Sequence, residues 1–133
     1  MNKIVVIGSL NLDIIQNISR LPLQGETLRV DSRGTNLGGK GANQAVAAAR
    51  QGADVSFIGA IGQDAAGVQF RNLLEDEGIN TAGLVEKEDA TGTATILLEE
   101  DGHNTILVYG GANMKLTADD VVNSEQLIAE ADF

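Results

Sequence analysis

Short apolar runs alternate along the chain with segments of helical character. Residues 3–9 (KIVVIGS) and 54–62 (DVSFIGAIG) are rich in β-branched residues and end in serine or glycine, which is typical of strands buried on both faces of a sheet. Residues 42–51 have the composition of a helix, and Gly52 stands where a glycine commonly ends one. This alternation predicts an α/β fold with a parallel main sheet.

A further helix is predicted after the 54–62 run. Asp64 can cap its first turn and Gly78 can end it. The apolar residues between them fall at the spacing of one helix face: Ala66, Phe70, Leu73 and Leu74. Thr117 and Asp120 form a capping-box pattern that predicts the start of another helix.

Other runs have the composition of exposed strands. Residues 13–22 and 26–36 mix polar residues with Thr, Val and Ile, around a turn that contains proline and glycine. Residues 91–111 form two β-rich runs around Asp101-Gly102, a strong hairpin signal. Because these strands interrupt the α/β alternation, we expect a small second sheet that grows out of the main body.

Composition narrows the possible classes. The 133 residues, 43% of them hydrophobic, suffice for one domain with its own core. A net charge of −10 argues against non-specific binding of nucleic acid or anionic membranes. The absence of cysteine excludes disulfides and is compatible with a cytoplasmic location. The apolar run at the N-terminus is too short, and is followed too soon by polar residues, to be a signal peptide or a membrane span. The last residues (IAEADF) resemble the start of a strand, so we expect a fragment of a longer protein.

A loop-to-helix junction rich in glycine is the first candidate site. The first turn of a helix presents unpaired N–H groups and a partial positive charge, and glycines let a ligand approach that backbone. Lys40 adds a donor, and the Asn43 side chain can both donate and accept. Residues 38–43 (GGKGAN) therefore predict a site for phosphate or for the oxygens of a polyol. A plain loop-to-helix turn with an exposed lysine is the alternative interpretation.

Neither common nucleotide motif matches this junction. A Walker A loop needs serine or threonine after its lysine, whereas Lys40 is followed by Gly41. A dinucleotide fingerprint needs three spaced glycines directly after the first strand, where this chain has only Gly8. Binding of a dinucleotide is therefore disfavoured.

The end of the first strand holds a second candidate. Asn11 and Asp13 follow it, at the edge of the sheet where ligands bind in open α/β folds. Residues two apart in an extended segment face the same way. A carboxylate beside an amide can hold vicinal sugar hydroxyls. An Asx turn leaving the strand would explain the same residues, and the sequence alone does not place the two candidates together.

Other polar residues are interpreted as surface groups. His103 falls in the predicted hairpin turn, residues 99–102 (EEDG) form a solvated turn, and residues 75–78 (EDEG) end a helix. A single histidine without cysteine makes a zinc site improbable, and we identify no Ser/His/Asp set.

Four segments together resemble the N-terminal part of the ribokinase branch of the PfkB carbohydrate kinases, and the resemblance runs through essentially the whole chain. They are VVIGSLNLDI, LPLQGET, GGKGANQAVAAARQGADVSFIGAIGQDAAG and GGAN. Residues 38–62 fit the first signature pattern of the family. The resemblance implies a ribokinase-like parallel sheet flanked by helices and truncated at Phe133, with a β-sheet lid formed by residues of about 14–36 and 93–109.

The resemblance also implies roles for individual residues. Those expected to bind the sugar are Asn11, Asp13, Gly38, Gly39, Lys40, Gly41 and Asn43. Ala94, Ile96 and Ile106 would be lid residues that touch its apolar face. Lids of this kind often pair between two subunits, so a homodimer is expected.

The implied reaction is ATP-dependent phosphorylation of ribose to ribose 5-phosphate, with Mg²⁺ and a monovalent cation such as K⁺. The family's catalytic aspartate lies in a Gly-Ala-Gly-Asp motif that these 133 residues lack, and its nucleotide site is also C-terminal. We therefore expect this chain alone to be inactive. A kinase for another sugar or a nucleoside, or a non-catalytic module that binds sugar or dimerises, stays open.

Overall fold

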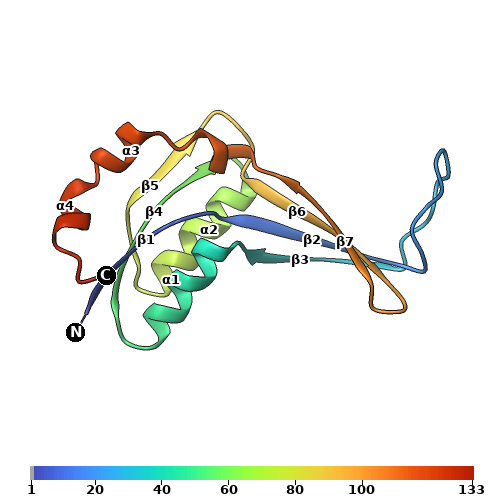
Figure 1. Cartoon of the computed structure of the whole chain (residues 1–133), viewed down its shortest axis with the longest axis horizontal. Helices are drawn as coiled ribbons and strands as arrows, with labels where there is room; N and C mark the ends of the chain where they lie inside the picture. Colours follow the sequence, from blue (N-terminus) through green and yellow to red (C-terminus); the bar gives the residue numbers. More distant parts are fainter. Residues whose placement is uncertain (1) are drawn as a thin grey trace.

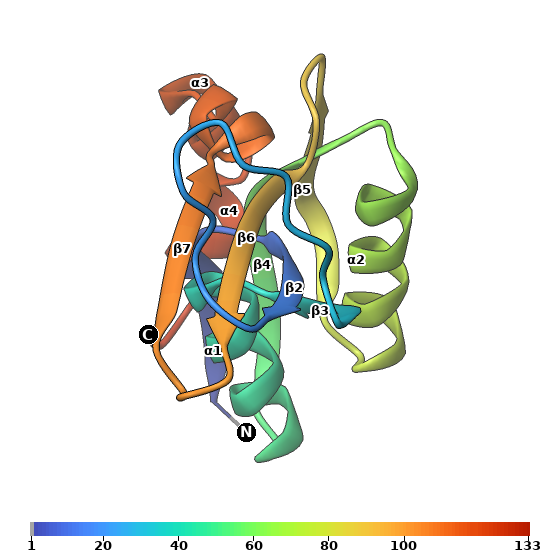
Figure 2. The same cartoon turned by 90° about the vertical axis from the view of Figure 1, so that its right-hand side faces the viewer.

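The computed structural model describes residues 2–133 and arranges them in two sheets of different kinds (Figure 1). A parallel sheet and its helices form the body of the molecule, and a mixed sheet projects from it (Figures 1 and 2). The elements in chain order are β1 Lys3–Ile7, β2 Asn11–Ile18, β3 Ser32–Gly38, α1 Lys40–Arg50, β4 Asp54–Gly62, α2 Ala65–Asp76, β5 Asn80–Lys87, β6 Gly92–Glu99, β7 Asn104–Tyr109, the 3₁₀ helix η1 Gly111–Lys115, α3 Ala118–Val122 and α4 Glu125–Ala129.

The body is built on three parallel strands in the order β1-β4-β5. Helices α1 and α2 cover one face, because their apolar stripes meet alternate residues of β4. The core cluster on this face includes Ala45 from α1, Phe57 from β4 and Phe70 from α2, all fully buried. On the opposite face η1 lies against β4, and Ile58 and Ala112 are also fully buried. The central strand is thus covered on both sides, as its largely apolar sequence predicts.

The projecting sheet has four strands in the order β3-β2-β6-β7. The central pair, β2 and β6, is parallel, and each continues from a strand of the body, β1 and β5 respectively. The outer strands β3 and β7 pair antiparallel with them. The long loop between β2 and β3 lies at the tip farthest from the body (Figure 1). The start of β2 is therefore the place where the projecting sheet joins the body.

Local chemistry explains where the helices begin and end. The side chain of Asp64 accepts a hydrogen bond from the Gly67 N–H at 2.8 Å, which confirms the predicted cap of α2. The capping box of α3 is also present. Gly52 and Gly78 have φ values of 94° and 74° directly after the ends of α1 and α2. Where a helix ends with a residue in this left-handed conformation, that residue is usually glycine.

Two sequence expectations differ from the structure. The first strand is not buried on both faces: the side chain of Ile7 is 49% exposed. This strand lies at the edge of the sheet, and α1 covers only the face that carries Ile4 and Val6. The sequence also gave no prediction of β5, whose alternating and charged residues are a weak strand signal.

The described C-terminal residues lie beside β1. The Val5 N–H donates to the carbonyl of Phe133 at 2.9 Å, and the Asp132 N–H donates to the carbonyl of Lys3 at 2.8 Å. Residues 131–133 therefore run along the free edge of β1 without forming a strand of their own. No helix within residues 2–133 is both long and apolar enough to cross a membrane.

Candidate functional site

The two candidate motifs meet where β2 begins and β3 ends. Asn11 is the cross-strand partner of Gly38, and Asp13 is the partner of Asn36. Cross-strand partners project their side chains to the same face of a sheet. Asn11 and Asp13 on β2 therefore share one face of the sheet with Gly38 on β3, although they are far apart from it in the sequence. This face lies at the junction with the body.

Asp13 is the ionisable group on this face. Burial raises the pKa of its carboxyl above the ordinary value. No hydrogen bond reaches its carboxylate from residues 2–133, yet its oxygens are not sealed from solvent. A β-carbon on Gly38 would lie 2.6 Å from Oδ2 of Asp13, so the space for this carboxylate exists because residue 38 has no side chain. The carboxylate is free to accept hydrogen bonds from a ligand.

The expected lid residues share the face of Asp13. Ala94 on β6 is the cross-strand partner of Asp13, and Ile96 is the partner of Ile15 two residues further along. Ile106 on β7 pairs with Ile96. Ala94 is buried, whereas the side chain of Ile106 is 51% exposed. The face thus has a polar end at the body and an apolar stretch toward the tip.

The start of α1 lies against the connection between β1 and β2. The Ala42 N–H donates to the carbonyl of Ser9 at 3.1 Å, and the Asn43 N–H donates to the carbonyl of Gly39 at 2.9 Å. No backbone acceptor within residues 2–133 is assigned to the N–H groups of Lys40 and Gly41, which begin the helix. These two donors are the part of the helix start that can serve a ligand.

Two glycines of the motif are required by the packing of the chain on itself. A β-carbon on Gly41 would lie 2.7 Å from the backbone of Gly8 and Ser9, and one on Gly39 would lie 2.8 Å from the carbonyl oxygen of Ser9. Gly39 also has a φ of 95°. These glycines let α1 approach the strand connection, a reason independent of any ligand. Gly38, by contrast, makes room for Asp13.

Lys40 and Asn43 are exposed on the first turn of α1. The structure does not join Lys40 to another site residue by a hydrogen bond or ion pair within the described chain. Asn43 lines an open cavity of about 510 Å³ together with Asn36, the cross-strand partner of Asp13, and Leu73 of α2. Asn43 therefore lies on the same cavity as Asn36 of β3.

Asn113 of η1 holds the start of β2 through three hydrogen bonds. Its Oδ1 accepts from the Leu10 N–H at 3.0 Å, and its Nδ2 donates to the Leu10 carbonyl at 3.0 Å. The same Nδ2 donates to Oδ1 of Asn11 at 2.9 Å. A β-carbon on Gly92 would lie 2.2 Å from Nδ2 of Asn113 and 2.4 Å from Oδ1 of Asn11, so only glycine at residue 92 admits this amide pair.

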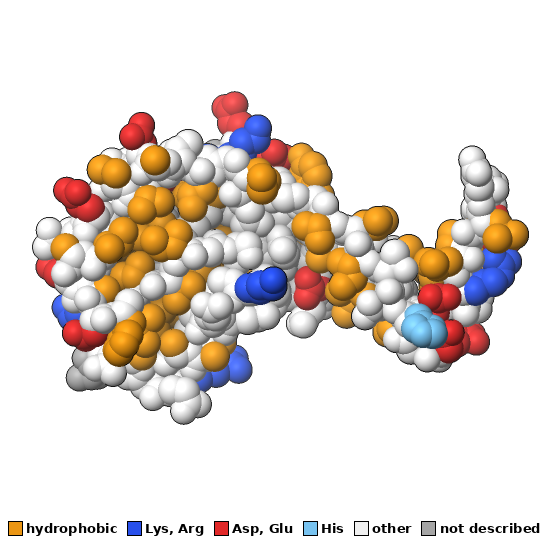
Figure 3. Space-filling model, viewed as in Figure 1, with side chains coloured by type: hydrophobic (Ala, Val, Ile, Leu, Met, Phe, Trp, Pro, Cys, Tyr) orange, Lys and Arg blue, Asp and Glu red, His pale blue; other side chains and the backbone are white. Residues whose placement is uncertain are grey.

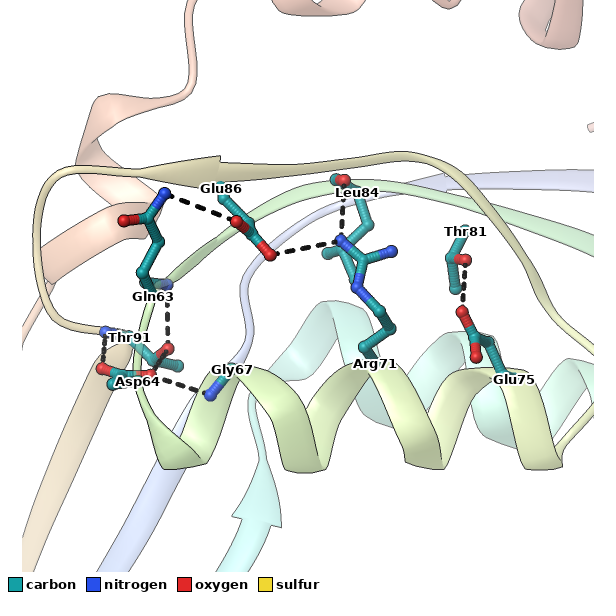
Figure 4. A network of polar contacts seen from close by, with 10 residues as sticks. Gln63, Asp64, Gly67, Arg71, Glu75, Thr81, Leu84, Glu86 and Thr91 are labelled. Carbon is teal, nitrogen blue, oxygen red and sulfur yellow. Dashed lines mark hydrogen bonds and ion pairs between the residues drawn. The ribbon is translucent and has the colours of Figure 1, made fainter.

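A second set of hydrogen bonds holds the start of β6 (Figure 4). Oδ2 of Asp64 accepts from the Thr91 N–H at 2.8 Å, and Oδ1 accepts from the Thr91 hydroxyl at 2.6 Å. The buried Thr91 hydroxyl accepts in turn from the Gly62 N–H at 2.9 Å. Burial raises the pKa of Asp64, but the bonds from Thr91 and Gly67 outweigh it, so that this pKa is lowered.

Other polar groups near α2 form surface contacts. Arg71 approaches Glu86 at 4.0 Å and donates to the Leu84 carbonyl at 3.4 Å, as Figure 4 shows. His103 contacts Asp101 in the exposed hairpin turn, as expected from the sequence. Within residues 2–133 no group of three or more His, Cys, Asp or Glu side chains is arranged to hold a metal ion.

The sequence did not reveal the roles of Thr91 and Asn113. Asn113 belongs to the GGAN segment, which the sequence marks only as part of a resemblance. Its contacts depend on a partner 103 residues away, Leu10. Thr91 lies 27 residues from Asp64. A glycine after each apolar run was visible, but which polar group it accommodates depends on the tertiary structure.

Comparison with known proteins decides the family. Residues 1–133 match the pfkB family of carbohydrate kinases along their whole length. The chain belongs to this family. The resemblance inferred from the four segments is confirmed, and so is the α/β fold with its parallel and mixed sheets.

The pfkB chain is similar to several curated ribokinases. It is 42% identical to the ribokinase of Staphylococcus aureus, over 99% of this chain and 44% of that protein. It is 41% identical to the ribokinase of Bacillus subtilis, over 100% of this chain and 45% of that protein. The chain therefore spans less than half the length of these relatives.

Solved structures show the same fold. One described as Sa239 superposes with a TM-score of 0.93 at 42% identity, covering 100% of this chain and 45% of the other. The ribokinase of Arabidopsis thaliana, solved in complex with ribose and ATP, has a TM-score of 0.85 at 36% identity and covers 98% of this chain and 43% of the other. A nucleoside kinase of Methanocaldococcus jannaschii has a TM-score of 0.78 at 26% identity, covering 84% and 38%.

Proposed function

We propose that this chain is the sugar-binding part of a ribokinase, and that the full-length enzyme transfers a phosphoryl group from ATP to D-ribose to give ribose 5-phosphate. The observation that carries the proposal is the shared face of Asn11 and Asp13 beside Gly38, where a carboxylate that has no hydrogen-bond partner among residues 2–133 lies beside an amide. The likeness to ribokinases, one of them solved with ribose and ATP, supports ribose as the substrate.

The chemistry of this face suits a sugar. The Asp13 carboxylate can accept hydrogen bonds from two vicinal hydroxyls, and charge-assisted bonds of this kind are the strong ones. Asn11 contributes hydrogen bonds beside it, and Asn43, Lys40 and the glycine backbone contribute from the start of α1. Ala94, Ile96 and Ile106 offer apolar contact to the carbon side of the ring. A sugar that lies across this face can form hydrogen bonds with its polar end and apolar contacts with the stretch toward the tip.

The projecting sheet is proposed to act as a lid, formed by residues of about 14–36 and 93–109 in one ribokinase-like domain. It extends from the body beyond the candidate site (Figure 1). Its edge strand β7 exposes apolar side chains on both faces, among them Leu107 at 58% and Val108 at 65%. Apolar side chains also gather along this sheet in Figure 3. Such a surface favours the proposed homodimer through the lid.

The other reactants are proposed to bind elsewhere in the full-length enzyme. Within residues 2–133 no acidic cluster is arranged to hold Mg²⁺, and the helix start at Lys40 matches neither nucleotide motif. We therefore assign ATP, Mg²⁺ and K⁺ to parts of the enzyme outside these 133 residues, as well as the catalytic aspartate. We propose a cytoplasmic location for the enzyme, where ATP is available.

Calorimetric titration of the 133-residue chain with ribose, fructose and adenosine tests the substrate. Tighter binding of ribose than of fructose or adenosine supports the proposal, and tighter binding of adenosine supports the nucleoside alternative, which the likeness to a nucleoside kinase favours. If no ligand binds, the proposed sugar site is wrong. A homodimer without sugar binding would then support the non-catalytic alternative.

A coupled assay of ADP release tests whether the catalytic and nucleotide-binding parts of the enzyme lie outside these 133 residues. Because the 133 residues lack the Gly-Ala-Gly-Asp motif and we assign the nucleotide site to other parts of the enzyme, we expect them to give no ribose-dependent turnover of ATP. The full-length enzyme, assayed in parallel, is the positive control. Ribose-dependent ADP release by the shorter chain would show that the 133 residues contain these parts themselves.

A further inference from the structure

Asn113 forms its hydrogen bonds with groups whose polarity is fixed. The Leu10 backbone presents one N–H and one carbonyl to the Asn113 amide, and these groups cannot exchange their roles as donor and acceptor. Oδ1 of Asn113 must therefore face the Leu10 N–H, and Nδ2 must face the carbonyl. A side-chain amide that pairs with another side chain alone would lack this constraint, because either end could face either partner.

The fixed amide of Asn113 in turn fixes the amide of Asn11. Nδ2 of Asn113 carries two protons, of which one is donated to the Leu10 carbonyl and the other points at Asn11. Only an acceptor can face that proton, so Oδ1 of Asn11 turns toward Asn113. Nδ2 of Asn11 then makes no hydrogen bond within the described chain and stays accessible to solvent.

We propose that Asn113 is a positioning residue for sugar recognition, which forces Asn11 to present its N–H groups, and not its carbonyl, to the ligand. The proposal rests on the proposed sugar site. On β2 the face then presents a donor group, Nδ2 of Asn11, two residues from an acceptor group, the Asp13 carboxylate. A hydroxyl that donates to Asp13 becomes a better acceptor from Asn11, because linked hydrogen bonds polarise one another. The ligand is then recognised by a donor on Asn11 and an acceptor on Asp13, whose positions cannot be exchanged.

Side-chain amide exchange in the unmodified chain tests the orientation without any ligand. We expect the Asn113 NH₂ protons to exchange slowly in nuclear magnetic resonance spectra and the Asn11 NH₂ protons to exchange fast. Addition of ribose should then slow the Asn11 protons. Protection of the Asn11 NH₂ equal to or greater than that of Asn113 in the absence of ribose would overturn the proposal.

Two substitutions at residue 113 separate orientation from packing. Asn113→Asp keeps the shape of the side chain but replaces the NH₂ donor by an oxygen that faces the Leu10 carbonyl and Oδ1 of Asn11. The Asn11 amide must then rotate and present its carbonyl to the sugar. Asn113→Ala only frees the Asn11 amide. We expect ribose affinity to fall about tenfold or more in Asn113→Asp, and by less in Asn113→Ala.

A role in packing alone predicts the reverse order, because alanine leaves a cavity and aspartate does not. Asn72→Asp, which makes the same change at an exposed residue of α2, is the matched control and should bind ribose as the unmodified chain does. Equal affinities for all variants at residue 113, with folding verified by circular dichroism, would refute the proposal. If the unmodified chain binds no ribose, the proposed function fails, and the exchange measurement still decides the orientation of Asn11.

Discussion

The Asp13 carboxylate occupies the space that a side chain at Gly38 would fill: a β-carbon at residue 38 would lie 2.6 Å from Oδ2 of the aspartate. Gly38→Ala should therefore displace the carboxylate and lower ribose affinity about tenfold or more, because the bonds it accepts depend on its direction. The backbone of residue 38 is not left-handed, so the fold should tolerate alanine.

Gly34→Ala is the control for this prediction. It lies on the same strand, and a β-carbon there would have no atom within 4 Å. Titration calorimetry should give the control the affinity of the unmodified chain. Equal affinities for both alanine variants would show that Asp13 does not need the space.

Removal of the Asp13 charge should stabilise the empty chain and abolish sugar binding. Burial raises the pKa of this carboxyl in the folded state, so folding is favoured when it is protonated, below about pH 4. That contribution is lost as the pH rises through the folded-state pKa. Asp13→Asn escapes the loss, and its melting temperature should exceed that of the unmodified chain at pH 7 but not at pH 3.5.

Ribose titration of the same variant supplies the functional half. An amide cannot replace a carboxylate that accepts two hydroxyls, so affinity should fall more than about tenfold. A variant with lower thermal stability at neutral pH, or with unchanged affinity, would contradict the assignment of Asp13 as a partly buried carboxylate that binds the ligand.

Thr91→Val should destabilise the fold by about 1–3 kcal/mol, because it leaves the buried Gly62 N–H without its acceptor and removes a donor to Asp64. Thr95→Val on β6, four residues after Thr91, is the control, since the Thr95 hydroxyl makes no hydrogen bond within residues 2–133. Urea denaturation measures both free energies of unfolding. Similar losses in the two variants would mean that the Asp64–Thr91 contact contributes little.

The paired variant Leu107→Lys with Val108→Lys should abolish the proposed homodimer, because two lysines on the exposed strand β7 would have to lose their hydration in the interface. Val68→Lys, a substitution at an exposed residue of α2, should leave the dimer intact. Sedimentation velocity distinguishes the two states. A dimer that persists in the paired variant places the interface elsewhere.

Features of local origin could be predicted from the sequence. The predicted strand 54–62 has the bounds of β4, because a short, largely apolar run that lies between Gly52 and Gly62 is a strong signal for a buried strand. Asp64 and Thr117 cap helices as expected, since a cap depends only on residues within one turn. The hairpin at Asp101-Gly102 is also confirmed, with Gly102 at a φ of 91°.

Features of tertiary origin could not be predicted. The exposed face of β1 depends on which helices cover it, and the KIVVI run does not contain that information. The strands of the projecting sheet were expected, but the parallel pairing of β2 with β6 joins residues from distant parts of the chain. For the same reason the sequence could not show that the backbone of Gly8 and Ser9 fills the space where a β-carbon of residue 39 or 41 would lie.

The separation of Asn11 from Asn113 has a consequence for biosynthesis. These residues lie 102 positions apart, and β2 must also wait for β6 to be translated before its parallel edge is paired. Long-range pairing of this kind is slow, and unpaired strand edges attract other chains meanwhile. On the ribosome, the hairpin of β2 and β3 emerges early with the residues of the proposed sugar site already on it, and the Asn113 amide that is proposed to orient Asn11 emerges much later.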